Sequence, residues 1–199
     1  MPEVSDVKLK PSKIVCVGLN YLDHAKEMNM PRPADPVIFL KPPSSVIFSG
    51  QAIVYTAMTK NLHYEGDLAV VMKSKDCVLG YTCANDVTAR DLQKLDGQWT
   101  RAKGFDTFCA LGPEIIQLDD PDNLNIRTLL NGEVKQSANT RNMIFKVAEL
   151  ISFISQIMTL EPEDVILTGT PPGVGPMQRG DQVIVEIEGI GRLVNNVAD

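Results

Sequence analysis

The apolar residues of this chain fall into short runs that proline and glycine interrupt, and this pattern most constrains its fold. Residues 31–60 alternate prolines with apolar runs at 37–40, 46–48 and 53–55. Runs this short are typical of strands, because helices of globular domains need longer stretches. Further strands are expected at 13–19, 65–72, 77–84, 109–116, 124–130 and 182–187. The pattern therefore predicts a β-rich α+β fold, a roll or a sandwich.

Helical patterns are confined to three segments. Residues 22–28 are helix-forming and are followed by Pro31 and Pro33, which stop a helix. Residues 88–95 offer a second helix. Residues 143–158 carry apolar side chains in one stripe, which predicts an amphipathic helix of about four turns.

Length and composition indicate one globular domain. The chain has 199 residues, of which 44% are hydrophobic and 22% charged, and this is enough to bury a sizeable core. We assign residues 1–12 to an N-terminal tail and residues 13–199 to a single domain. The formal net charge of −6 disfavours nucleic acid or an anionic membrane surface as a partner.

The expected compartment follows from the absence of targeting patterns and from the cysteines. No apolar run approaches the roughly 20 residues of a membrane span. Residues 1–13 resemble neither a signal peptide nor an arginine-rich transit peptide. The four cysteines have no Cys-x-x-Cys spacing and lie mostly in apolar runs, as reduced, buried side chains do. We expect a cytoplasmic protein, with the mitochondrial matrix as the alternative.

Three carboxylates form the first candidate site. Glu65 and Asp67 are two positions apart in the expected strand 65–72, so their side chains point to one face, about 7 Å apart along the chain. Asp86 follows the apolar run 77–84 and can provide a third ligand from a neighbouring strand. An all-oxygen set without a nearby Cys or His pair suits Mg²⁺ or Mn²⁺ better than zinc.

A Glu-x-Asp pair is also common on the wet face of ordinary antiparallel strands, and the residues alone leave that interpretation open. Glu186 and Glu188 show the same spacing. They precede a glycine-rich turn, and no apolar run there leads to a third acid. We therefore interpret that second pair as solvent-exposed strand residues.

A candidate general base lies nearer the N-terminus. His24 and Glu27 are three residues apart, so on one helical turn they share a face and can form a hydrogen bond. A carboxylate that orients an imidazole is the usual arrangement for a general base. A solvated surface pair has the same spacing, so this pattern alone does not decide between the two.

Several motifs in collinear order resemble the fumarylacetoacetate hydrolase family. These motifs lie at residues 17–24 (VGLNYLDH), 65–67 (EGD), 85–91 (NDVTARD), 98–108 (QWTRAKGFDTF) and 167–175 (LTGTPPGVG). The resemblance covers residues 13–196, nearly the whole chain. It implies the mixed β-sandwich roll of that family's C-terminal domain, with a few helices, and it implies a homodimer.

The resemblance also assigns the candidate residues to roles. It implies that Glu65, Asp67 and Asp86 bind Mg²⁺ or Mn²⁺. It places His24 and Glu27 on a mobile lid, residues 20–31, that closes over the metal and activates water. The acids and the histidine pair are therefore expected to meet in one site.

Three further residues are expected to contact the substrate. Lys103 would neutralise charge beside the acids and fix a substrate carboxylate, and we count it among the catalytic residues. Gln93 follows Asp86 by seven residues and would orient the substrate through its amide. Thr170 would donate a hydrogen bond to a substrate carboxylate. Lys41 is expected to be structural, and Arg90 and Arg101 to brace loops.

The implied substrates are 2-oxo acids, small molecules that chelate a divalent cation through the C1 carboxylate and the C2 oxygen. The first expected reaction is hydrolysis of an acylpyruvate to pyruvate and a carboxylic acid, with oxaloacetate decarboxylation as a further activity. The alternatives are isomerisation or decarboxylation of a 2-oxo-heptenedioate and hydrolysis of fumarylpyruvate. An alternative of another class is a catalytically decayed homodimer that serves as a binding protein.

Three features depart from the family pattern. The connection between Val71 and Gly80 is shorter than in relatives and allows only a hairpin turn, unless residues are missing there. Asp67 stands where many relatives have the longer glutamate, which predicts weaker metal affinity. Leu19 stands where some acylpyruvase-like relatives have arginine, which removes one candidate contact to a substrate carboxylate.

Overall fold

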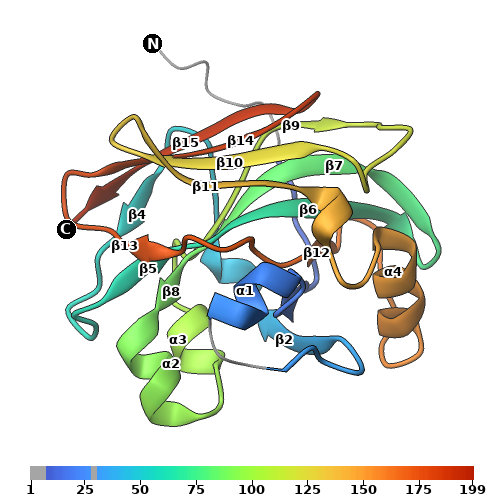
Figure 1. The fold of residues 1–199 in the computed structure, drawn as a ribbon, viewed down its shortest axis with the longest axis horizontal. Helices are drawn as coiled ribbons and strands as arrows, with labels where there is room; N and C mark the ends of the chain where they lie inside the picture. The colour runs from blue at the N-terminus through green and yellow to red at the C-terminus, as the bar shows by residue number, and fades with distance from the viewer. Residues whose placement is uncertain (1–7, 28–30) are drawn as a thin grey trace.

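Two sheets pack around the main hydrophobic core (Figure 1). The structure is a computed structural model that describes residues 8–27 and 31–199. Parts of the predicted tail (1–7) and lid (28–30) therefore lie outside the described residues. The larger sheet contains, in spatial order, β2 (Val37–Lys41), β1 (Ile14–Gly18), β12 (Val165–Leu167), β6 (Gly66–Ser74), β7 (Cys77–Asp86), β9 (Cys109–Ile116) and β3 (Val46–Phe48).

Two smaller sheets complete the described β-structure. One contains β11 (Glu133–Asn139), β10 (Asn125–Leu130), β14 (Gln182–Ile187), β15 (Gly191–Ala198) and β4 (Ala52–Val54). The other contains β13 (Gly175–Pro176), β5 (Leu62–Tyr64) and β8 (Thr88–Ala89). The pairs β1–β12, β3–β9 and β4–β15 are parallel and the other pairs are antiparallel. The predicted β-rich, mixed sandwich-like roll is confirmed.

Strand β6 is buried on both faces, and this determines where its acid points. Leu68, Val70 and Met72 belong to the main core, which includes residues of β10, β14 and β15. Ala69 and Val71 belong to a second apolar cluster. Because side chains alternate along a strand, Asp67 lies on the face of this second cluster, away from the five-stranded sheet.

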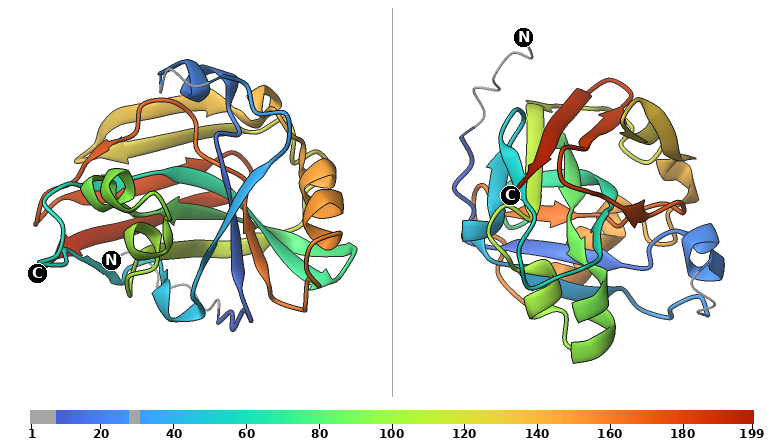
Figure 2. Two further views of the ribbon diagram at one scale, coloured as in Figure 1. Left: turned by 90° about the horizontal axis from the view of Figure 1, so that it is seen from below. Right: turned by 90° about the vertical axis from the view of Figure 1, so that its left-hand side faces the viewer.

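In the described ranges, four α-helices lie at the edges of the sheets (Figure 2). They are α1 (Leu22–Glu27), α2 (Arg90–Asp96), α3 (Thr100–Lys103) and α4 (Val147–Ser155). Single turns of 3₁₀ helix are found at Pro43–Ser45 and Thr140–Asn142. Within the described residues, no helix is long and apolar enough to cross a bilayer. Helices α2 and α3 lie side by side, while α4 stands alone at the opposite end of the molecule (Figure 1).

The predicted helix at 143–158 is wrong in extent, because α4 is much shorter. The main-chain oxygen of Asn20 accepts from the N–H of Ile144 at 2.7 Å, and its side-chain oxygen accepts from the N–H of Phe145 at 2.8 Å. These contacts hold the predicted first turn in a non-helical conformation. The helix then begins with the Glu149 carboxylate accepting from the N–H of Lys146 at 2.7 Å, which is one half of a capping box.

The short connection between β6 and β7 is a hairpin. Ser74 pairs with Cys77, and two residues, Lys75 and Asp76, form the turn. Cys77 is exposed beside this turn, which corrects the expectation of burial for that cysteine. Cys16, Cys83 and Cys109 are buried, and all four thiols are free.

Candidate active site

The three predicted metal ligands meet at the ends of β6 and β7. Strand pairing places Gly66 opposite Asn85, and the N–H of Asp86 donates to the main-chain oxygen of Glu65 at 2.8 Å. Glu65 and Asp86 are therefore cross-strand neighbours, and Asp67 follows two residues further on the same face. All three line one cavity of about 170 Å³, and none is more than 7% exposed.

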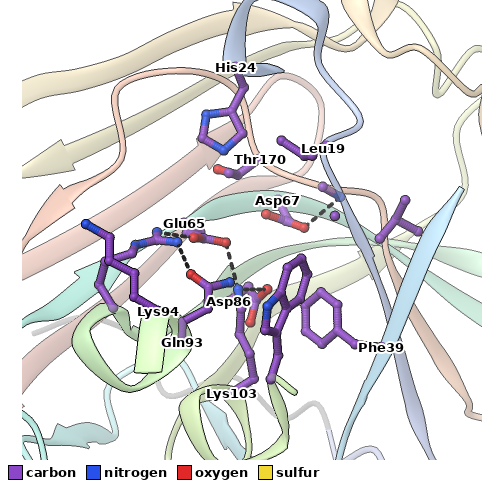
Figure 3. A pocket seen from close by; sticks show the side chains of 15 residues that line it. Leu19, His24, Phe39, Glu65, Asp67, Asp86, Gln93, Lys94, Lys103 and Thr170 are labelled. Carbon is purple, nitrogen blue, oxygen red and sulfur yellow. Dashed lines mark hydrogen bonds and ion pairs between the residues drawn. The ribbon is translucent and has the colours of Figure 1, made fainter. Parts of the chain in front are cut away.

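Buried cations hold two of these acids (Figure 3). The Lys103 ammonium donates to Glu65 Oε2 at 2.8 Å and to Asp86 Oδ2 at 2.6 Å. The Arg90 guanidinium donates to Glu65 Oε1. Lys41 donates to Asp86 Oδ1 at 2.5 Å. Because unpaired buried charges are costly, these contacts offset the cost of burying the two carboxyl groups.

The pKa values of the acids follow from these contacts. Burial by itself would raise the pKa of Glu65, but Lys103 and Arg90 hold it below its ordinary value. Asp67 is in the opposite situation. Burial, followed by the charges of Asp86 and Glu65, raises the pKa of Asp67 well above its ordinary value. A positive charge is therefore lacking on the Asp67 side of the cavity.

The residues present fit a hard divalent cation. Asp67 Oδ2 accepts from the N–H of Gly169 at 2.8 Å, while Oδ1 is buried and has no hydrogen-bond partner among the described residues. A buried carboxylate oxygen without a partner, beside two more carboxylates, is a donor set for Mg²⁺ or Mn²⁺. As placed, no three His, Cys, Asp or Glu side chains of the described residues lie close enough together to hold one ion. Lys103 stands between Glu65 and Asp86 instead.

His24 lies over the same cavity, held by Glu27. Its side chain is 7% exposed and its Nδ1 is 2.9 Å from Glu27 Oε2. The Glu27 carboxylate also accepts from the N–H of Gly173 at 3.2 Å, so α1 is docked on the glycine-rich loop. Figure 3 shows the ring beside Thr170, pointing toward the acids. The second ring nitrogen, Nε2, is left to face a ligand.

The acids, the lysine and the histidine of this cavity all lie in the motifs quoted from the sequence. The family model described as fumarylacetoacetate (FAA) hydrolase C-terminal matches residues 13–198. The chain belongs to this family. The resemblance predicted from the motifs is confirmed, and so is the fold that it implied.

Named relatives in the family catalyse several reactions. Human mitochondrial oxaloacetate tautomerase FAHD2A is 45% identical over 210 residues, which cover 94% of this chain and 67% of that protein. The structure of a 2-hydroxyhepta-2,4-diene-1,7-dioate isomerase from Mycobacterium marinum has a TM-score of 0.88 and 49% identity, and the match covers 96% of this chain and 75% of that one. A fumarylpyruvate hydrolase from Pseudomonas aeruginosa, solved with Mn²⁺ and pyruvate, has a TM-score of 0.89 and 32% identity, over 98% and 93% of the two chains.

Two residues predicted to contact substrate, Gln93 and Thr170, also line the cavity. The Gln93 amide oxygen accepts from Arg90 at 2.5 Å, so its NH₂ group is left for a ligand. The Thr170 hydroxyl donates to the main-chain oxygen of Gly66 at 3.0 Å and accepts from Gln136 at 2.8 Å. Its one proton is therefore used inside the protein. The substrate contacts of both residues remain predictions.

The cations around the acids include two that motif reasoning assigned to structural roles. Arg90 was expected to brace a loop, yet it lines the cavity and binds Glu65. It precedes Gln93 by three residues, so helical spacing was a usable signal for it. Lys41 is 1% exposed and donates a hydrogen bond to the Asp86 carboxylate. Arg101 does brace its loop, through Asp96 at 2.7 Å.

An apolar wall faces the charged residues, and motif reasoning did not identify it. Phe39 and Trp99 line the cavity and contact each other edge to face, with ring centroids 5.2 Å apart. The Lys103 ammonium lies 4.9 Å from the centre of the Phe39 ring, a cation–π contact. Leu19, with φ of 55°, completes this wall. No single motif predicts this wall, because its residues come from three separate segments of the chain.

Proposed function

We propose that this chain is a divalent-cation-dependent enzyme that interconverts the enol and keto forms of 2-oxo acids. The observation that carries the proposal is the position of His24. It is buried, it is oriented by Glu27, and it lines the cavity that contains the three acids. Mg²⁺ or Mn²⁺ bound by Glu65, Asp67 and Asp86 would act as a Lewis acid on the C2 oxygen of the substrate.

The His24–Glu27 pair provides the proton-transfer group. In the tautomer whose Nδ1–H donates to Glu27, the lone pair of Nε2 would be free to accept a proton. In the keto-to-enol direction Nε2 takes a proton from C3. The electron pair of that C–H bond forms the C2–C3 double bond, the π pair of the C2 carbonyl moves onto its oxygen, and that oxygen takes the proton from Nε2. The reverse sequence restores the keto form, and no atom is gained or lost.

The named activities of two relatives support proton transfer as the first candidate reaction. The tautomerase and the isomerase are 45% and 49% identical to this chain. Tautomerisation also needs fewer parts, because no water has to be positioned for attack. Lys103 bridges Glu65 and Asp86, so its positive charge acts on both acids.

Acylpyruvate hydrolysis is the second candidate, and Leu19, Phe39 and Trp99 favour it. Their apolar wall offers space for an acyl chain. Here Nε2 would deprotonate a water that attacks the distal carbonyl carbon. The C3–C4 bond then breaks, its electrons stay on C3, and C3 takes the proton back from His24. The products are pyruvate and a carboxylic acid.

One experiment separates these reactions. The protein is given acetylpyruvate or oxaloacetate in the enol form, with Mn²⁺ or with a chelator. Loss of enol absorbance and formation of pyruvate are measured in parallel. Tautomerisation predicts enol loss without pyruvate, and hydrolysis of acetylpyruvate predicts equal amounts of pyruvate and acetate. Turnover that persists in the chelator, or no turnover of either acid, contradicts the proposal.

The two histidines of the chain provide a matched pair of variants. His24→Gln removes the proton acceptor and is expected to reduce kcat by about 10²–10⁴-fold, the usual contribution of a general base. Its affinity for Mn²⁺, measured by calorimetry, should stay unchanged. His63→Gln is the control, because His63 does not line the cavity. Equal losses in both variants would remove His24 from the mechanism.

The resemblance further supports our proposal of a homodimer. The mass of the protein in solution, measured by light scattering, tests it directly. A strictly monomeric protein that retains full activity would contradict it.

A further inference from the structure

The cations of the cavity fall into two groups that differ in burial and in pairing. Lys41, Arg90 and Lys103 are buried and bind Glu65 or Asp86. Lys94 is exposed and also lines the cavity. The buried group already compensates those two acids, so the charge of Lys94 is additional to what the acids require.

Lys94 forms no ion pair within the described part of the chain. Two acids lie close to it in sequence on α2: Asp96, two residues after it, is paired with Arg101, and Asp91 lies three residues before it. Asp91 instead accepts from the Thr59 hydroxyl and, at 2.9 Å, from the N–H of Lys60. It therefore holds the loop before β5, and the ammonium of Lys94 is left for a ligand.

The surroundings of Lys94 are positive. Arg90 and Lys94 are four residues apart on α2, so the two cations share one face of the helix, an arrangement that by itself is unfavourable. The same region affects His63. Burial, and after it the charge of Arg90, lowers the pKa of His63 to about 4, and Lys94 adds to that lowering. An anion bound here would relieve the repulsion.

Lys94 is placed where its charge can contact a substrate bound in the cavity. Gln93, its neighbour on α2, lines the same cavity and has a free NH₂ group. Figure 3 shows Lys94 across the acids from Phe39, so the cavity has an apolar side and a cationic side. A 2-oxo acid bound at the three carboxylates can extend toward either side, and the two directions select different substrates.

We propose that Lys94 is a specificity-determining residue that binds the second carboxylate of a 2-oxo dicarboxylic acid. This inference rests on the proposed function and narrows its substrate class to diacids whose far end reaches the rim of the cavity. Lys94 takes no part in proton transfer. It selects the direction in which the substrate extends, away from the apolar wall of Leu19 and Phe39.

The test uses two stable ligands of equal length, 2-oxoadipate and 2-oxohexanoate. They differ only in that a carboxylate replaces the terminal methyl group. Their dissociation constants are measured by calorimetry with the Mn²⁺-loaded protein, so turnover is not needed. A second pair one carbon shorter, 2-oxoglutarate and 2-oxopentanoate, measures how far Lys94 reaches. The wild type is expected to prefer the diacid of at least one pair by about two- to fivefold, as for an ion pair near the surface.

Two substitutions and a control complete the design. Lys94→Gln should bring the ratio of the two dissociation constants close to one, and Lys94→Glu should reverse the preference. Rising salt should reduce the wild-type preference, because exposed charges are screened. Lys75→Gln, an equal charge change in the exposed β6–β7 turn, should leave the ratio unchanged.

The outcomes separate this inference from the function beneath it. Suppose that the wild type binds both ligands of each pair but Lys94→Gln leaves the ratios of their dissociation constants unchanged. Lys94 then does not bind the second carboxylate, and the proposed function stands. If no 2-oxo acid binds the Mn²⁺-loaded wild type, the proposed function fails, and the role of Lys94 fails with it.

Discussion

Asp67 differs from the other two acids of the site because no cation neutralises it. Its one strong contact is the N–H of Gly169 at 2.8 Å, and its second oxygen is buried without a partner in the described chain. Glu65 and Asp86, by contrast, bind Arg90, Lys103 or Lys41. At the scale of single residues, the buried and unneutralised Asp67 therefore lowers the stability of the metal-free protein.

We expect Asp67→Asn to stabilise the metal-free protein while it weakens metal binding. The raised pKa means that the folded state holds a proton that the unfolded state releases, so the free energy of unfolding of the wild type falls as pH rises above about 4. Asparagine cannot ionise and should abolish this fall. Urea unfolding in a chelator at pH 5 to 8 should show the variant more stable by about 1–3 kcal/mol at the upper end.

The matched control is Asp76→Asn in the exposed β6–β7 turn, which removes the same charge far from the cavity. It should change the pH profile little. A wild-type profile that is flat in chelator, or an Asp67→Asn variant that is less stable than the wild type at every pH, would show that Asp67 is not strained by its surroundings.

At the scale of elements, one side chain of the five-stranded sheet joins β6 to the glycine-rich loop. Gln136 on β11 is 1% exposed. Its Oε1 accepts from the N–H of Gly66 at 3.0 Å, and its Nε2 donates to Thr170 Oγ1 at 2.8 Å and to the main-chain oxygen of Pro171 at 2.7 Å. Gly66 lies between two metal-ligand candidates, so the second sheet helps to position the acids of the first.

We expect Gln136→Met to destabilise the fold by about 2–4 kcal/mol, because it leaves buried main-chain groups without partners. Gln136→Glu keeps an acceptor for Gly66 and should lose less. Urea unfolding measures both. Gln156→Met, an exposed position at the end of α4, is the control. Similar losses in Gln136→Met and Gln156→Met would show that the buried network contributes little.

At the scale of the whole molecule, metal binding should raise the temperature of unfolding. Glu65 immediately precedes β6, Asp67 and Asp86 lie in β6 and β7, and Lys103 ends α3. An ion that binds only the folded arrangement therefore stabilises the entire domain. Mn²⁺ at a hundredfold excess over its Kd should add about 2.7 kcal/mol, and the shift should grow with concentration. Thermal unfolding with and without Mn²⁺ measures it.

Asp86→Ala provides the comparison, because it removes one ligand candidate. Its melting temperature should no longer respond to Mn²⁺. A wild-type melting temperature that does not depend on Mn²⁺ would contradict the metal site, and an equal shift in Asp86→Ala would place the ion elsewhere.

Local patterns predicted much of the fold and of the site. Short apolar runs predicted most of the strands of the large sheet, since a strand buried on both faces reads as a continuous apolar segment. The two-residue spacing of Glu65 and Asp67, and the three-residue spacing of His24 and Glu27, placed each pair on one face. The structure brings these four side chains and Asp86 to the same region.

What the sequence by itself determined is therefore whatever depends on neighbours in the chain: strand periodicity, helix faces and the collinear motifs of the family. Only the tertiary structure decided the contacts between distant segments. Asn20 shortens α4, Lys41 supports Asp86 across 45 positions, and Gln136 reaches Gly66 across 70. The physical reason is that periodicity is local, whereas a buried donor or acceptor takes whichever partner the packing of the whole chain brings within reach.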